Sequence, residues 1–296
     1  MFKKSVLPHP QIYLAHFIKN SNASSWIYIH GGPGYNCGTL EYLIEHDNLF
    51  SLFNDNIILY DQRTCGRSID FPEEVTHADN IQDLDEIYNY LTESCGTPIK
   101  GFIGHSYGAK LLFDYYEKYN REIPGIFIST ANSILIPRLN NLFFDLAYLK
   151  KTNPTKYNDI FAEMPTLDLA KLWNLTEKLA PFFQENKERR YLYWANLECM
   201  EKVQHIQARI NLPVNQNTFM KVRQLLYSNE KNFSIAIDKL AIPYLWINGF
   251  HDVVMSGAEK IFSNQLSPII PFYQSAHYPH IEESDRFCHL VNHTFK

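Results

Sequence analysis

The chain has 296 residues, of which 45% are hydrophobic and 20% are charged, and its formal net charge at pH 7 is −5. A chain of this length buries roughly 75% of its unfolded surface, enough for one large core with an inserted segment. The acidic balance argues against nucleic acid or an anionic membrane as a partner. No stretch approaches the ~20 apolar residues of a membrane span, and five scattered cysteines favour a reducing compartment. We therefore expect a cytoplasmic protein.

Short apolar runs predict the strands of a mostly parallel sheet, because helical patterns alternate with the first of them. One such helix opens at Thr76-x-x-Asp79 and closes near Gly96. Its apolar positions at helical spacing are Ile81, Leu84, Ile87, Tyr88 and Leu91. The predicted strands lie at residues 26–29, 57–60, 101–103, 126–128, 243–247 and 269–273, with Gln11–Ile18 as a further candidate before them.

The strand signal stops between Thr130 and Pro243. This span is rich in Tyr, Phe, Trp and Leu, and prolines interrupt its helical patterns. The economical interpretation is a helical cap inserted after the sixth strand. We expect residues 131–235 to form this cap, and residues 1–130 and 236–296 to form an α/β core.

The motif Gly104-His-Ser-Tyr-Gly108 lies between an apolar run and a helical pattern. Strand, sharp turn and helix in this order place Ser106 at the apex, where the following helix N-terminus favours developing negative charge. The flanking glycines allow the tight turn. The pattern G-x-S-x-G has only three fixed positions in five residues and also occurs by chance in loops. A nucleophilic role for Ser106 therefore depends on catalytic partners elsewhere in the chain.

A serine nucleophile needs a histidine that takes its proton and an acid that orients the histidine. Asp252 follows the predicted strand at 243–247, and His277 follows the one at 269–273. The order Ser, Asp, His is that of α/β-hydrolases. Taken singly, Asp252 also fits an ordinary turn residue, and His277 competes with His280, His289 and His293. No H-E-x-x-H or C-x-x-C motif is present, so we expect neither a metal nor a cofactor.

The segment His30-Gly-Gly-Pro-Gly34 follows the first predicted strand, and it supplies an independent check of the hydrolase interpretation. In a hydrolase, a loop at this place brings a backbone N–H opposite the serine, and the residue after the serine brings another. These oxyanion-hole donors would be Gly32 and Tyr107. A dinucleotide loop is the competing interpretation, but Cys37 stands where G-x-G-x-x-G needs its third glycine.

Five motifs together resemble the proline iminopeptidase (prolyl aminopeptidase) family of α/β-hydrolases. The motifs are His30–Gly34, Asp61-Gln-Arg-Thr-Cys-Gly-Arg-Ser68, Gly104–Gly108, Gly249-Phe-His-Asp252 and His277-Tyr-Pro-His-Ile-Glu282. The resemblance runs from about Trp26 to Phe287 and implies the α/β-hydrolase fold. It selects His277 rather than His280, because the glutamate five residues later falls at Glu282. The Asp61–Ser68 segment looks architectural.

The chain departs from the family at three places. The elbow reads Gly-His-Ser-Tyr-Gly instead of G-G-S-W-G, a form that many esterases share, and Thr64 replaces a usual glycine. In the family, cap carboxylates hold the substrate's α-amino group. The family's W-x-x-W-E pattern reads Trp194-Ala-Asn-Leu-Glu198 here, and Asn211 stands where a second carboxylate follows A-R-I.

On one helix Trp194, Glu198 and Glu201 would share a face and could bind a substrate amine. The same pattern fits an ordinary amphipathic helix with solvated glutamates.

The leading interpretation is a serine hydrolase that removes an N-terminal residue, preferably proline, from short peptides. A carboxylesterase or amidase acting on small non-peptide substrates is one alternative. A non-catalytic ligand receptor on a hydrolase scaffold is another, because a fold alone does not fix function. The oligomeric state and the natural substrate are left open.

Overall fold

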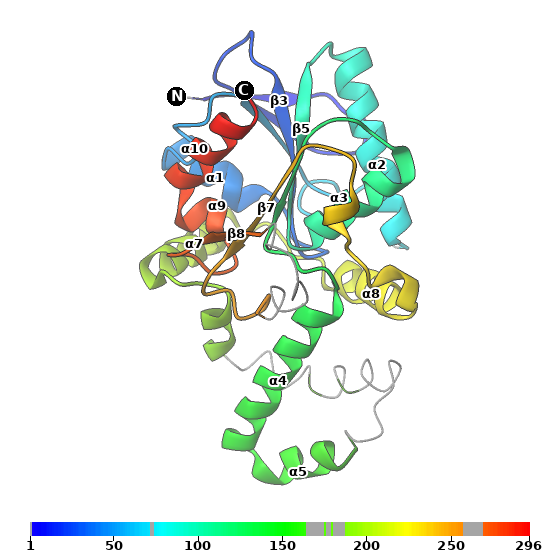
Figure 1. Ribbon diagram of the computed structural model, residues 1–296, viewed down its shortest axis with the longest axis vertical. Helices are drawn as coiled ribbons and strands as arrows, with labels where there is room; N and C mark the ends of the chain where they lie inside the picture. The colour runs from blue at the N-terminus through cyan, green and yellow to red at the C-terminus, as the bar shows by residue number, and fades with distance from the viewer. Residues whose placement is uncertain (1, 72–73, 164–174, 176–178, 180–186, 257–268) are drawn as a thin grey trace.

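The structure, a computed structural model, describes residues 2–71, 74–163, 175, 179, 187–256 and 269–296. The strands are β1 (Lys3–Leu7), β2 (Leu14–Ile18), β3 (Ser25–Ile29), β4 (Asn56–Tyr60), β5 (Ile99–His105), β6 (Gly125–Ile128), β7 (Tyr244–Gly249) and β8 (Ile269–Phe272). They form one sheet in the order β1-β2-β4-β3-β5-β6-β7-β8 (Figure 1). Strand β2 pairs antiparallel with β1 and with β4, and every neighbouring pair from β4 to β8 is parallel. The predicted mostly parallel sheet is confirmed.

All six apolar runs are strands, and the weaker candidate contains β2. Strand β1 was not predicted. Three of its five residues are exposed, as befits an edge strand, so it carries no apolar run.

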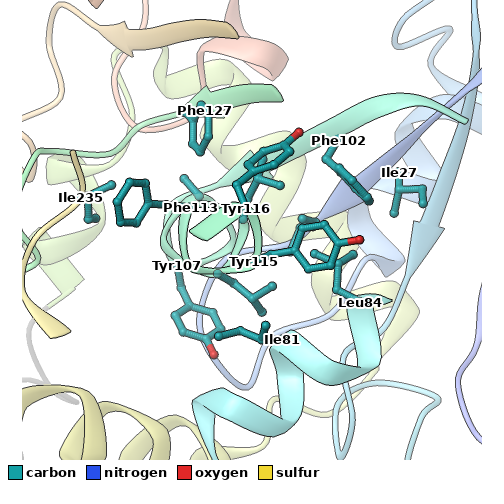
Figure 2. Close-up of a cluster of buried hydrophobic side chains, with 14 of the residues drawn as sticks. Ile27, Ile81, Leu84, Phe102, Tyr107, Phe113, Tyr115, Tyr116, Phe127 and Ile235 are labelled. Carbon is teal, nitrogen blue, oxygen red and sulfur yellow. The ribbon is translucent and has the colours of Figure 1, made fainter. Parts of the chain in front are cut away.

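Helices cover both faces of the sheet. Helices α2 (His77–Asn89) and α3 (Tyr107–Tyr119) lie on one face, and α1 (Gly38–His46) and α10 (Ser284–Thr294) lie on the other (Figure 1). A four-residue helix, α9 (Pro279–Glu282), precedes α10. Because side chains alternate along a strand, each strand feeds both cores. Figure 2 shows the core beneath α2 and α3, where Phe102, Phe127, Tyr115 and Tyr116 lie together.

The predicted start of α2 is confirmed in detail. The Thr76 hydroxyl accepts a hydrogen bond from the Asp79 amide, and the Asp79 carboxylate accepts one from the Thr76 amide. This reciprocal cap satisfies two amides that a helix N-terminus leaves without partners. The chain leaves the following π-helical turn, Tyr90–Ser94, through Gly96 at φ 63°.

The segment between β6 and β7 is helical in its described part, as predicted. It contains α4 (Leu135–Thr152), α5 (Pro154–Glu163), a 3₁₀ helix (Lys187–Leu192), α7 (Leu197–Ile210) and α8 (Gln216–Tyr227). Helices α4 and α5 project away from the sheet, while α7 and α8 flank it (Figure 1). The insertion therefore follows the sixth strand, and its role as a cap over 131–235 stays a prediction. Among the described residues, no helix has the length and apolar composition needed to span a membrane.

Helix α3 packs unusually close to the sheet at Gly108. A Cβ added there would lie 2.2 Å from the Ile29 carbonyl oxygen, which is backbone and cannot move aside. At Gly96 a Cβ would meet nothing within 4 Å, so only the left-handed backbone resists a side chain.

We expect Gly108→Ala to lower the free energy of unfolding by about 3 kcal/mol or more through overpacking. The matched variant Gly96→Ala should cost about 1 kcal/mol, because its strain is conformational only. Urea unfolding of both proteins measures the difference. Equal costs would contradict the steric origin of the glycine at position 108.

Candidate active site

Ser106 has a strained backbone at the junction of β5 and α3. Its φ of 56° and ψ of −116° lie outside the regions that an L-residue normally occupies. The strain is held in place by packing: the Ser106 amide donates to the Ile128 carbonyl, and a Cβ on Gly104 would lie 2.6 Å from the Gly108 carbonyl oxygen. The serine is thus the apex of a strand-turn-helix elbow, as predicted.

Asp252 and His277 are joined by a buried hydrogen bond. The His277 Nδ1 atom lies 2.9 Å from Asp252 Oδ2, and each residue is 3% exposed. Asp252 also serves as a turn residue, because its Oδ1 accepts from the Met255 amide. Gly249 allows the two loops to meet, since a Cβ there would lie 2.0 Å from the Ala276 carbonyl oxygen. One carboxylate oxygen therefore bonds to His277, and the other closes the turn.

His105 connects the His277 loop to the elbow. Its Nε2 donates to the His277 carbonyl oxygen at 2.8 Å, and the two rings lie 5.1 Å apart. Burial lowers the pKa of His105 well below its ordinary value, and the rings of His280 and His277 add to the effect. Because His105 directly precedes Ser106, this hydrogen bond ties the His277 loop to the elbow.

His280 has a different environment from His277. It is 1% exposed, and its Nε2 lies 3.0 Å from the Tyr28 hydroxyl. Burial lowers the pKa of His280 to about 3, with a further contribution from His277. Among the residues that the structure describes, no carboxylate bonds to this ring, and a neutral ring of this kind suits a packing role. The geometry thus distinguishes the two histidines that compete in the sequence.

The two amides expected to form an oxyanion hole are free. Within the described part of the chain, neither the Gly32 nor the Tyr107 amide makes a hydrogen bond. Gly31 brings the glycine-rich loop against the elbow, because a Cβ there would lie 3.1 Å from the Ser106 Cβ atom. Gly32 has a φ of 125°, which only glycine adopts readily.

The Tyr107 side chain is anchored by residues that the sequence did not single out. Its hydroxyl lies 2.9 Å from His77 Nδ1 and accepts from Asn80 Nδ2 at 3.0 Å. The other His77 nitrogen lies 2.6 Å from the Asp114 carboxylate. No motif links these side chains, since their contact depends on how α2 packs against α3.

Comparisons with known proteins agree with the fold. The family model described as "Alpha/beta hydrolase family" matches residues 26–290. The chain belongs to the α/β-hydrolase family. A curated proline iminopeptidase of Saccharolobus solfataricus is 25% identical over 287 residues, which cover 94% of this chain and 86% of that protein. The predicted resemblance is thereby confirmed.

Two solved structures share the hydrolase fold over nearly the whole chain. A proline iminopeptidase-related protein from Thermus thermophilus has a TM-score of 0.66 at 17% identity, covering 99% of this chain and 97% of that one. An esterase from Exiguobacterium antarcticum has a TM-score of 0.61 at 15% identity, covering 96% of each chain. At these identities the likeness shows the fold alone.

The hydrolase's Asp61–Ser68 segment is architectural, as its sequence suggested. The buried Asp61 carboxylate accepts from the Cys37 amide and from both the amide and Nε of Arg67. Thr64, which replaces a usual glycine, has a φ of 62°. Its hydroxyl lies 2.6 Å from that of Thr218 on α8, so the segment also anchors the insertion.

The expectation that Trp194 and Glu198 share one helix is wrong. The 3₁₀ helix ends at Leu192, and α7 begins at Leu197 with Asn196 as its N-cap, whose side chain accepts from the Cys199 amide. An asparagine two residues before the glutamate was the available signal. The Trp194 ring instead stacks on Tyr278 at 4.3 Å, in the loop that carries the candidate base.

Glu198 and Glu201 lie on α7 but are exposed to solvent. Both line an open groove of about 500 Å³ together with Tyr42, Asp47, Lys202, His205, Ile206 and Arg209. In the described residues, no hydrogen bond or ion pair joins either glutamate to Ser106 or His277. Asn211, which stands at the family's second carboxylate position, ends α7 in the left-handed conformation that asparagine tolerates.

We expect the hydrolase to lose stability in acid partly through His280. Below pH 6.5 the unfolded chain binds a proton that folded His280, with its pKa of about 3, does not bind. The free energy of unfolding should fall by about 1.4 kcal/mol per pH unit from this residue, and the contribution should be constant above pH 6.5. His280→Gln should reduce the slope between pH 6 and pH 4 by that amount in urea unfolding.

His289, which is exposed, supplies the control for this measurement. His289→Gln should leave the slope unchanged, whereas equal slopes for His280→Gln and the unaltered protein would contradict the assignment of His280 as a buried neutral ring.

Proposed function

We propose that the protein is a serine hydrolase in which Ser106 is the nucleophile, His277 the general base and Asp252 the residue that orients His277. The hydrogen bond between His277 Nδ1 and Asp252 carries this proposal, together with the strained turn at Ser106. Since Nδ1 donates to the carboxylate, Nε2 has the lone pair needed to accept the serine proton. The buried carboxylate then stabilises the imidazolium that forms.

The chemistry follows from these roles. Ser106 Oγ attacks the substrate carbonyl while its proton passes to His277, and the amides of Gly32 and Tyr107 donate to the oxyanion. His277 returns the proton to the leaving amine or alcohol as the C–N or C–O bond breaks. A water molecule then cleaves the acyl-enzyme by the same route, which releases the acid and restores the serine.

We propose short peptides with a free N-terminus, preferably N-terminal proline, as substrates. The support is the curated relative, a proline iminopeptidase that the chain matches over 94% of its length. A carboxylesterase or amidase is the second candidate, because Glu198 is exposed and Asn211 cannot balance an ammonium charge.

One substrate comparison separates the two candidates. Turnover of proline-4-nitroanilide supports the aminopeptidase, while turnover of 4-nitrophenyl acetate alone supports the esterase. Failure of a fluorophosphonate probe to label Ser106 would favour the third interpretation, a non-catalytic receptor.

Ser106→Ala should reduce kcat by about 10⁶-fold, and Asp252→Asn by up to ~10⁴-fold through the wrong histidine tautomer. His277→Ala should abolish turnover, whereas His280→Gln should retain most of it. Steady-state kinetics on whichever chromogenic substrate is cleaved measures all four. If the His280→Gln protein were inactive and the His277→Ala protein active, the assignment of His277 as the base would be refuted.

We expect Glu198 to contribute little to amine binding, because its side chain is exposed to water. An exposed ion pair contributes about 0–1 kcal/mol, so Glu198→Gln should lower kcat/KM for proline-4-nitroanilide by at most about 5-fold. Turnover of a neutral ester should not change. A loss of 10-fold or more confined to the amine substrate would show that α7 closes over the substrate.

A further inference from the structure

The peptide between Ser106 and Tyr107 has an unusual position in the elbow. Tyr107 is the first residue of α3, so its amide has no carbonyl one turn earlier in the helix to bond. The peptide also borders the strained Ser106 backbone, with its φ of 56° and ψ of −116°. Rotation about the Ser106 ψ angle would relieve this strain and would turn the Tyr107 N–H at the same time.

Hydrogen bonds hold this peptide at one end. The Ser106 carbonyl accepts from the Ala109 amide at 3.0 Å and from the Lys110 amide at 3.4 Å. At the other end, the part of the chain that the structure describes offers the Tyr107 amide no partner. A donor for an oxyanion needs such an unbonded N–H, and its direction then depends on what fixes the rest of Tyr107.

The Tyr107 side chain reaches from α3 to α2, where two polar groups hold its hydroxyl. Figure 2 shows the ring near Ile81, in the core beneath the two helices. His77 Nδ1 lies 2.9 Å from the hydroxyl oxygen, and Asn80 Nδ2 donates to that oxygen at 3.0 Å. Both anchors lie at the start of α2, which the reciprocal cap at Thr76 fixes. The ring is therefore attached to a second, well-defined helix.

The His77 ring is itself fixed in orientation. Its Nε2 lies 2.6 Å from Asp114 Oδ2, and an ionised carboxylate only accepts, so Nε2 bears a proton. In the neutral ring Nδ1 is then the acceptor, and the Tyr107 hydroxyl donates to it. The other Asp114 oxygen accepts from Lys110 Nζ at 2.7 Å. Because Tyr107, Lys110 and Asp114 are spaced by three and four residues on α3, this chain of bonds returns to the helix on which it began.

We propose that the Tyr107 hydroxyl, held by His77 and Asn80, positions the Tyr107 amide as a donor to the oxyanion. The inference rests on the hydrolase function proposed above and adds a positioning group to its oxyanion hole. The hydroxyl acts through the backbone, because it keeps the direction of an amide that the strain at Ser106 would otherwise turn. The oxyanion forms only during the reaction, so the hydroxyl contributes to kcat and not to substrate binding.

Tyr107→Phe keeps the ring and removes the hydroxyl. We expect kcat to fall roughly 10- to 100-fold with KM unchanged, because a misplacement of about 1 Å costs up to about 10²-fold in rate. Steady-state kinetics on the chromogenic substrate that the unaltered protein cleaves measures both constants.

Tyr116→Phe is the matched control. Tyr116 lies on the same helix, is 3% exposed, and its hydroxyl donates to the Pro124 carbonyl at 2.9 Å. Both variants lose one buried, hydrogen-bonded hydroxyl, so they should lose similar stability in urea unfolding. Only Tyr107→Phe should slow turnover, which a merely structural hydroxyl would not do.

A transition-state analogue tests oxyanion binding directly. When 2,2,2-trifluoroacetophenone binds, Ser106 Oγ bonds to its carbonyl carbon, the serine proton passes to His277, and the carbonyl π electrons become the oxyanion lone pair. The inhibition constant should rise in Tyr107→Phe by the same factor by which kcat falls. In Tyr116→Phe it should equal that of the unaltered protein.

Two variants of His77 test the anchor. His77→Leu removes the acceptor of the Tyr107 hydroxyl and should lower kcat. His77→Gln should retain most of the activity, because the Gln side chain can accept from the hydroxyl and donate to Asp114. The double variant with His77→Leu and Tyr107→Phe should be no slower than Tyr107→Phe alone, since both changes remove the same bond.

The outcomes distinguish this proposal from the hydrolase function. If the unaltered protein cleaves no substrate and does not bind the ketone, the hydrolase function fails and the role of Tyr107 fails with it. If the unaltered protein is active, the hydrolase function stands. The role of Tyr107 is then overturned when Tyr107→Phe keeps full kcat, when KM changes instead, or when Tyr116→Phe slows turnover equally.

Discussion

The close packing of α3 against β3 and β5 is the constraint on which the site depends. A helix that starts immediately after a strand must turn the chain within one residue, and here that residue is Ser106 in a strained conformation. Gly104 and Gly108 have ordinary backbone angles, so their value lies in the missing side chain. Because these two glycines have no side chains, α3 can approach the sheet closely enough to keep Ser106 in its strained conformation.

Three histidines lie in contact beside this turn, yet their environments make them chemically distinct. Burial favours the neutral form of His105 and His280, which bond to a carbonyl and to a tyrosine hydroxyl. His277 alone among them faces a carboxylate. The two neutral rings therefore place no added positive charge beside the proposed base.

Much of the core was predictable because its signals are local. Apolar runs predicted the six central strands, and Thr76 with Asp79 predicted the start of α2. Each of these signals depends only on residues that are near one another in the sequence. The elbow and the positions of Asp252 and His277 followed from strand ends, which meet at one edge of a parallel sheet.

The residues of the insertion that were expected to bind substrate were harder to predict from the sequence. Helix phase across Asn196 was misjudged because a single cap residue resets it, and the contacts of the other inserted helices depend on how the insertion packs, which no spacing encodes.

The hydrogen bond from the His277 amide to the Tyr193 carbonyl ties the proposed base to the insertion. The Glu282 carboxylate strengthens the tie, because it accepts from the amides of Ala195, Asn196 and Ala276 at once. The loop of the proposed base and this part of the inserted segment are therefore joined by several hydrogen bonds. Any displacement of Tyr193–Asn196 would therefore also displace the loop that carries the proposed base.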